Sequence, residues 1–169
     1  MKKNTLIIFI FLLIPAILQA REIQILYSEL PPFMFKKNSR PAGFYHDLLM
    51  EMKAEMDHIS FSFEHLPVKR LLLKLRQVPG TMCLGITRNP KREKLFKWVG
   101  PSIPRRVGVY RLKSRDTLKL ESTADFEKYT FGVGRGFAAI QDLLKHGVPM
   151  EHISQVSKDS ANIIKLFRH

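Results

Sequence analysis

Apolar and polar positions change their period several times along the first half of the chain. Residues 22–27 and 59–66 alternate between apolar and polar, a period of two that is typical of half-buried strands. Residues 45–58 and 67–78 instead carry apolar side chains at helical spacing, and the short apolar run 82–86 predicts a buried strand. The order strand, helix, strand, helix, strand favours a parallel sheet with crossover helices.

The second half of the chain again predicts strands that alternate with helices, but no strand is predicted after its last helix. A longer strand is predicted over residues 105–113, with apolar Val107, Val109 and Leu112, and a connector follows with a short helix capped near Ser122. The remaining elements are expected as strand, helix, strand and helix over residues 130–134, 137–147, 151–156 and 157–169.

The stretch between the first strand and the first helix, residues 28–43, is predicted to be a loop. It contains Pro31, Pro32 and Pro41 and ends at Gly43. Proline and glycine interrupt regular elements and favour turns.

The first 20 residues have the order of a secretory signal peptide. Lys2 and Lys3 precede an apolar run over residues 6–18, and the small residue Ala20 marks the expected cleavage site. A membrane anchor is the alternative, but the run is shorter than the ~20 residues that a spanning helix needs. We expect a soluble, exported mature chain.

The net charge indicates which class of partner the chain can bind, and the cysteine content indicates whether a metal site is expected. The chain has 28 Lys and Arg residues against 15 Asp and Glu, a net charge of +13. This favours an anionic partner, which could be a small acid, a lipid headgroup, a cell-wall polymer or nucleic acid. Nucleic acid is the least expected of these in an exported protein. The one cysteine, Cys83, lies in an apolar run and is predicted to be a small buried hydrophobe, so no zinc site or other cofactor is expected.

The candidate chemistry lies in "GITRNPKREKLFKWVGP", residues 85–101. It follows a predicted strand at the carboxyl edge of the sheet, where open α/β sheets bind ligands. Gly85 allows close approach of a ligand, Thr87 offers a hydroxyl, and an Asn-Pro pair can open a short helix that carries Arg92. An arginine binds a carboxylate through two parallel hydrogen bonds. Solvated surface charge is the alternative interpretation of the cluster.

Three blocks of the sequence resemble the family 3 extracellular solute-binding proteins, the amino-acid-type receptors of ABC importers. They are "YSELPPFMF…AGFYHDLLMEM", "LPVKRLLLKLRQVPGTMCLGITRNPKREKLFKWVGP" and "DFEKYTFGVGRGFAAIQDLLKHG". The resemblance implies an α/β fold of the type II periplasmic-binding-protein class. Its first lobe would span residues 21–104, and residues 105–169 would form the crossover and a partial second lobe.

The same resemblance implies roles for individual residues. Thr87 and Arg92 would hold the α-carboxylate of the ligand, with Gly85 beside them. The loop 29–35 would form one wall of the site, with Phe33 as the aromatic residue of the matching "PPF" turn. Glu29 is the candidate partner for an α-ammonium group, an inference from its charge.

Two residues and the length depart from the family pattern. Phe137 stands where amino-acid binders usually offer a Thr or Ser hydroxyl, and Leu30 stands where many carry a stacking aromatic residue. These departures argue against an ordinary α-amino acid as the ligand. The chain also stops where family members continue, so a C-terminally truncated protein is expected.

The functional expectation is a periplasmic, non-catalytic solute-binding protein. It would capture a small carboxylate-bearing, amino-acid-like solute for an ABC permease in the inner membrane, act as a monomer and bind no nucleic acid. Three alternatives remain open. The protein is a cationic exported protein that associates with anionic envelope surfaces, the remnant of a sensor or cell-wall-enzyme binding module, or a truncated chain without function.

Overall fold

The computed structural model describes residues 21–168 except residues 57 and 101. The predicted signal peptide and its cleavage after Ala20 lie outside these residues. Within the described part, no helix combines the length and the apolar character needed to cross a membrane.

The first half of the chain folds around a three-stranded parallel sheet of order β4–β1–β5. The central strand β1 (Arg21–Tyr27) pairs along its full length with β4 (Ile59–His65) and more briefly with β5 (Thr81–Met82). The register places Tyr27 opposite His65 at the carboxyl edge. The predicted parallel sheet is confirmed, although its third strand ends earlier than the apolar run 82–86 suggested.

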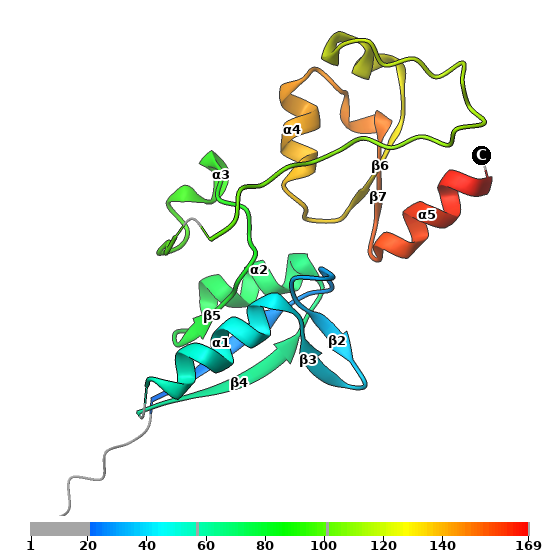
Figure 1. Ribbon diagram of the computed structural model, residues 1–169. Coiled ribbons are helices and arrows are strands. Elements are labelled where there is room, and N and C mark those ends of the chain that lie inside the picture. Colours follow the sequence, from blue (N-terminus) through cyan, green and yellow to red (C-terminus); the bar gives the residue numbers. More distant parts are fainter. Residues whose placement is uncertain (1–20, 57, 101, 169) are drawn as a thin grey trace, which may run out of the picture.

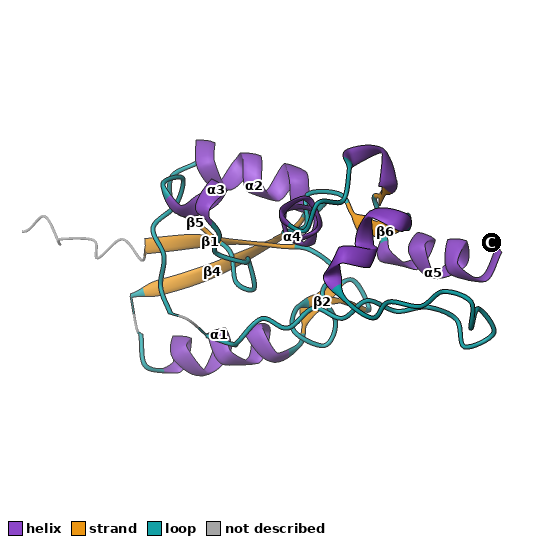
Figure 2. Ribbon diagram, turned by 90° about the horizontal axis from the view of Figure 1, so that it is seen from above, coloured by secondary structure: helices purple, strands orange, loops and turns teal. Residues whose placement is uncertain are grey.

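Two helices cover opposite faces of this sheet (Figure 2). They are α1 (Phe44–Ala54) and α2 (Val68–Gln77), both predicted from helical periodicity. With a helix on each face, the second half of the central strand, from Ile25 to Tyr27, is buried, which is why its residues on both sides of the sheet are apolar. The fully or nearly buried residues of this core are Ile25, Tyr27, Met34, Tyr45 and Leu49.

A small hairpin occupies the stretch that was predicted to be a loop, so that prediction was wrong for these residues. β2 (Phe35–Lys37) pairs antiparallel with β3 (Arg40–Ala42). The two residues between them, Asn38 and Ser39, have φ of 49° and 64°. Positive φ at both central residues gives the turn whose twist matches a two-residue hairpin.

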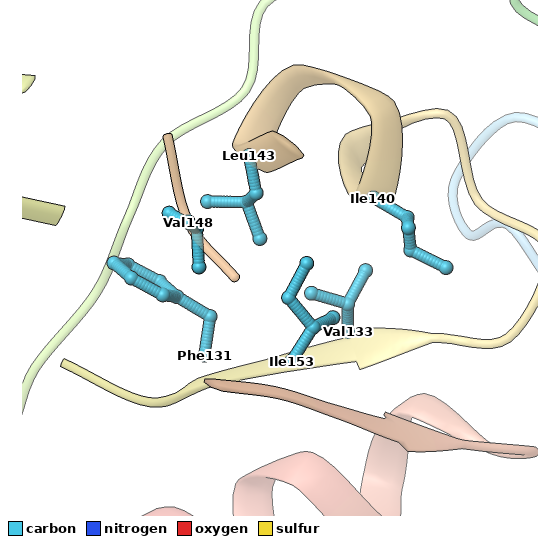
Figure 3. Close-up of a cluster of buried hydrophobic side chains, with 6 residues drawn as sticks. All are labelled: Phe131, Val133, Ile140, Leu143, Val148 and Ile153. Atoms are coloured by element: carbon cyan, nitrogen blue, oxygen red, sulfur yellow. The ribbon is translucent and has the colours of Figure 1, made fainter. Parts of the chain in front are cut away.

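The second half of the chain forms a separate, smaller unit (Figure 1). β6 (Phe131–Gly134) and β7 (Ile153–Val156) make a two-stranded parallel sheet. α4 (Ala139–Lys145) and α5 (Asp159–Arg168) lie on opposite sides of it (Figures 1 and 3). The core between β6, β7 and α4 consists of Phe131, Val133, Ile140, Leu143, Val148 and Ile153 (Figure 3), none of which belongs to the core of the first unit.

The connection between the two units contains one confirmed element and one corrected one. A 3-10 helix, η1 (Thr123–Lys128), starts with a capping box in which the Ser122 side chain accepts a backbone hydrogen bond, as predicted. The strand predicted over residues 105–113 was wrong, because these residues belong to no sheet. Val107 and Val109 are 57% and 47% exposed, so their alternation has no partner strand in the described part of the chain.

Candidate functional site

The local fold around Arg92 follows from the Asn-Pro pair before it. α3 (Pro90–Glu93) begins just beyond the carboxyl end of β5, and Pro90 occupies its first turn. The side chain of Asn89 caps this helix: its Oδ1 accepts a hydrogen bond from the Arg92 backbone N–H at 3.0 Å. The cap fixes the backbone of Arg92 on the helix that the sequence predicted there.

Two backbone carbonyls hold the Arg92 guanidinium. Nη1 donates to the Thr87 oxygen at 3.1 Å, and Nη2 donates to the Gly136 oxygen at 2.8 Å. These bonds use two of the five N–H donors of an arginine, so three remain for other acceptors. The side chain is half-buried, and this burial, followed by the positive charge of Arg105, lowers the pKa of Arg92. An arginine keeps its charge at neutral pH in spite of such a shift.

Gly136 is the residue of the second unit that contacts Arg92. It lies in the turn after β6 with φ of +83°, and a Cβ placed on it would be 3.4 Å from the Lys69 backbone nitrogen in the first turn of α2. Arg105, in the connection between the units, forms an ion pair with Asp142 of α4 at 2.5 Å. The turn that follows β6 therefore meets the turns that follow β4 and β5, and carboxyl edges of open α/β sheets are where ligands bind.

Gly85 and Phe33 both lie next to the aromatic ring of Tyr45. A Cβ on Gly85, whose φ is +77°, would lie 2.9 Å from Cε2 of Tyr45 and 3.3 Å from Cδ2 of Leu30. The centroid of the Phe33 ring is 6.0 Å from that of Tyr45. Tyr45 is 4% exposed, and its hydroxyl is 3.2 Å from Oγ of Ser102. Close packing against Tyr45 is thus one reason for a glycine at position 85.

Glu29 already has a partner that the sequence did not predict. Its Oε1 lies 3.1 Å from Nε2 of His65 and accepts a hydrogen bond from the Lys36 backbone N–H at 3.3 Å. Burial, followed by the negative charge of Glu29, raises the pKa of nearby Tyr27. The signal for this pair was the parallel pairing of the two strands, because their carboxyl ends carry Glu29 and His65 to the same edge.

Two other features lie apart from these residues. A groove of about 390 Å³ runs between residues 109–111 and 118–121, and no residue predicted for the site lines it. Among the described residues, no group of three His, Cys, Asp or Glu side chains is placed to hold a metal ion.

The two α/β units, meeting at the carboxyl edges of their parallel strands, define the fold class as type II periplasmic-binding-protein-like. The sequence matches no family model and no curated protein. Its structure is similar to solved amino-acid-binding proteins.

One similar structure is an ancestral arginine-binding protein bound to arginine, with a TM-score of 0.65 and 20% identity. Another is the ancestral amino-acid-binding protein AncCDT-1, a precursor of cyclohexadienyl dehydratase, with a TM-score of 0.70 and 16% identity. A third is ArtJ, the arginine-, lysine- and histidine-binding protein of Geobacillus stearothermophilus, with a TM-score of 0.68 and 15% identity.

The matches cover 87–88% of this chain, but the chain spans only 66%, 66% and 63% of the three proteins in the same order. This agrees with the prediction of an incomplete second lobe. At these identities the comparisons establish the fold alone. The identity of the ligand has to be argued from the chemistry of the site.

Proposed function

We propose that the chain is a non-catalytic solute-binding protein for a small carboxylate-bearing, amino-acid-like molecule. The observation that carries this proposal is the Arg92 guanidinium, oriented by the carbonyl oxygens of Thr87 and Gly136 with three N–H donors left. A guanidinium held in this way is preorganised to bind a carboxylate through two parallel hydrogen bonds. The amino-acid ligands of the structurally similar proteins support this chemistry.

The other predicted residues would surround the bound solute. The Thr87 hydroxyl would bind the same carboxylate, Gly85 would lie beside it, and Phe33 would contribute to the apolar wall. Glu29 would accept an ammonium group only by exchanging or sharing its His65 partner. Because Arg92 bonds to Gly136 of the second unit, the solute would favour the arrangement in which the two units meet.

The wider setting follows from the same proposal. We place the protein in the periplasm as a monomer that delivers its solute to an ABC permease in the inner membrane, with no role in nucleic-acid binding. The boundary between the two lobes at residues 104 and 105 is part of this proposal.

The test is thermal unfolding of the purified chain with a panel of amino acids and small organic acids. A solute that binds only the folded form raises the unfolding midpoint. Arg92→Ala should abolish that rise. Arg88→Ala is the matched control, because Arg88 lies in the same segment but is exposed and bonded to Glu93. The proposal fails if no compound raises the midpoint, or if Arg92→Ala responds like the wild type.

A further inference from the structure

Cations outnumber acids in the turns that meet at the carboxyl edges of the two sheets. Glu29 is the only acidic residue in the described segments 28–30, 66–70, 83–87 and 135–137. Lys69, Arg70 and Arg135 lie in these same turns. Arg92 follows on α3, where the adjacent acid Glu93 is paired with Arg88. A site of one dominant sign favours ligands of the opposite charge.

Glu29, the single acidic residue of these turns, already contacts other groups of the chain. Glu29 lies 3.1 Å from the His65 imidazole and accepts the Lys36 backbone hydrogen bond through the same oxygen. A ligand with a cationic side chain would have to compete with His65 for it. A basic amino acid would therefore meet Arg92 with its carboxylate, but its cationic side chain would find only one acidic group in these turns, and that group is already bonded to His65.

Lys69 is the cation placed to contact a second anionic group. Its backbone nitrogen lies 3.4 Å from the position of a Cβ on Gly136, the residue whose carbonyl oxygen binds Arg92. The Lys69 side chain is exposed. Arg92 bonds to Gly136 through its guanidinium, and the backbone of Lys69 lies next to the same glycine, so the exposed Lys69 side chain starts beside the Arg92 site.

We infer that the solute is a small molecule with two anionic groups, an acidic amino acid or dicarboxylate, with Arg92 on one carboxylate and Lys69 on the other. This inference rests on the proposed function and adds the charge class of the ligand. It separates this chain from the similar proteins that bind arginine, although their fold is the same.

Isothermal titration calorimetry of the purified chain with L-glutamate, L-glutamine and L-arginine tests the inference. Glutamate and glutamine have the same shape and differ in the charge of the side-chain group. We expect glutamate to bind about tenfold more tightly than glutamine, the ratio that one charge-assisted hydrogen bond provides. Arginine should bind more weakly than glutamine.

Lys69→Gln should bring the affinity for glutamate down to that for glutamine while leaving glutamine binding unchanged. Lys53→Gln removes the same charge near the end of α1. That end leads back to the start of β4, at the opposite edge of the sheet, so this variant should keep the preference for glutamate.

The other possible results distinguish failure of this inference from failure of the proposed function. Tighter binding of arginine, or equal binding of glutamate and glutamine, overturns the inference and leaves the proposed binding function in place. An equal effect of Lys69→Gln and Lys53→Gln overturns the role of Lys69. If none of the three compounds nor any member of the wider panel binds, the proposed function fails and this inference fails with it.

Discussion

Replacing Gly85 by alanine should destabilise the first unit through two separate effects. The backbone at Gly85 has φ of +77°, a conformation that costs a residue with a Cβ about 1–2 kcal/mol. The new methyl group would also lie 2.9 Å from the Tyr45 ring and 3.3 Å from Leu30. Contacts this short require neighbouring atoms to move.

Tyr45 has little freedom to move away. It is 4% exposed, its hydroxyl lies 3.2 Å from Oγ of Ser102, and its ring contacts those of Phe33 and Phe44. Overpacking of such a site costs about 1–3 kcal/mol. The two contributions together predict that Gly85→Ala lowers the free energy of unfolding by about 2–5 kcal/mol.

Gly80→Ala isolates the packing contribution. Gly80 has φ of +75°, almost the same as Gly85, but a Cβ on it would have no atom within 4 Å. Urea unfolding followed by far-UV circular dichroism should therefore show a loss of about 1–2 kcal/mol for Gly80→Ala and a clearly larger loss for Gly85→Ala. Equal losses would refute the close contact between Gly85 and Tyr45.

Side-chain truncation, acid and thiol labelling test three other features of the fold. Leu71 is 0% exposed and Leu73 is 52% exposed, so in urea unfolding Leu71→Ala should cost about 2–5 kcal/mol and Leu73→Ala much less. A hydrogen bond from Lys128, followed by those from the backbone, holds the pKa of Asp125 below its ordinary value of 3.8. Its stabilising effect is therefore present above that value and is lost as the pH falls through the folded-state pKa, so Asp125→Asn should flatten the acid side of a plot of thermal midpoint against pH. Burial, opposed by the charge of Arg92, raises the pKa of Cys83 to about 12. Cys83 is half-buried, so iodoacetamide near pH 8 should alkylate it far more slowly in the folded chain than in urea, and equal rates would contradict its partial burial and raised pKa.

Periodicity predicted α1, α2 and α4 well because each buries apolar residues against a core. It also predicted α5, although Ile163, Ile164 and Phe167 of that helix are exposed. It was less reliable for strands. Alternation of apolar and polar residues indicates that one face of a segment can be buried, but it does not indicate that another strand lies beside the segment to pair with it. Val107 and Val109 alternate as a strand would, yet no strand lies beside them in the described part of the chain. The hairpin turn at Asn38 and Ser39 was missed because it lacks the glycine that usually marks positive φ.

The site was predictable only where its contacts are local. The Asn-Pro pair indicated the short helix that carries Arg92, and the structure adds that the Asn89 side chain caps it from three residues away. The bond from Arg92 to Gly136 joins residues 44 positions apart, and the approach of Glu29 to His65 depends on strand order. The first leaves no signal in a single sequence, because backbone carbonyl partners have no residue signature. The second could have been found only from the parallel pairing of the two strands, whose carboxyl ends bring Glu29 and His65 to one edge.

The two separate hydrophobic cores have a consequence for how the chain acquires its structure. Every buried residue of the first unit lies between Ile25 and Leu71, and every buried residue of the second between Phe131 and Val156, among the residues that the structure describes. A chain that emerges from its N-terminus can therefore complete the first core before the second has left the ribosome. The bond between Arg92 and Gly136 would form last, so the contact that joins the units would also mark the end of folding.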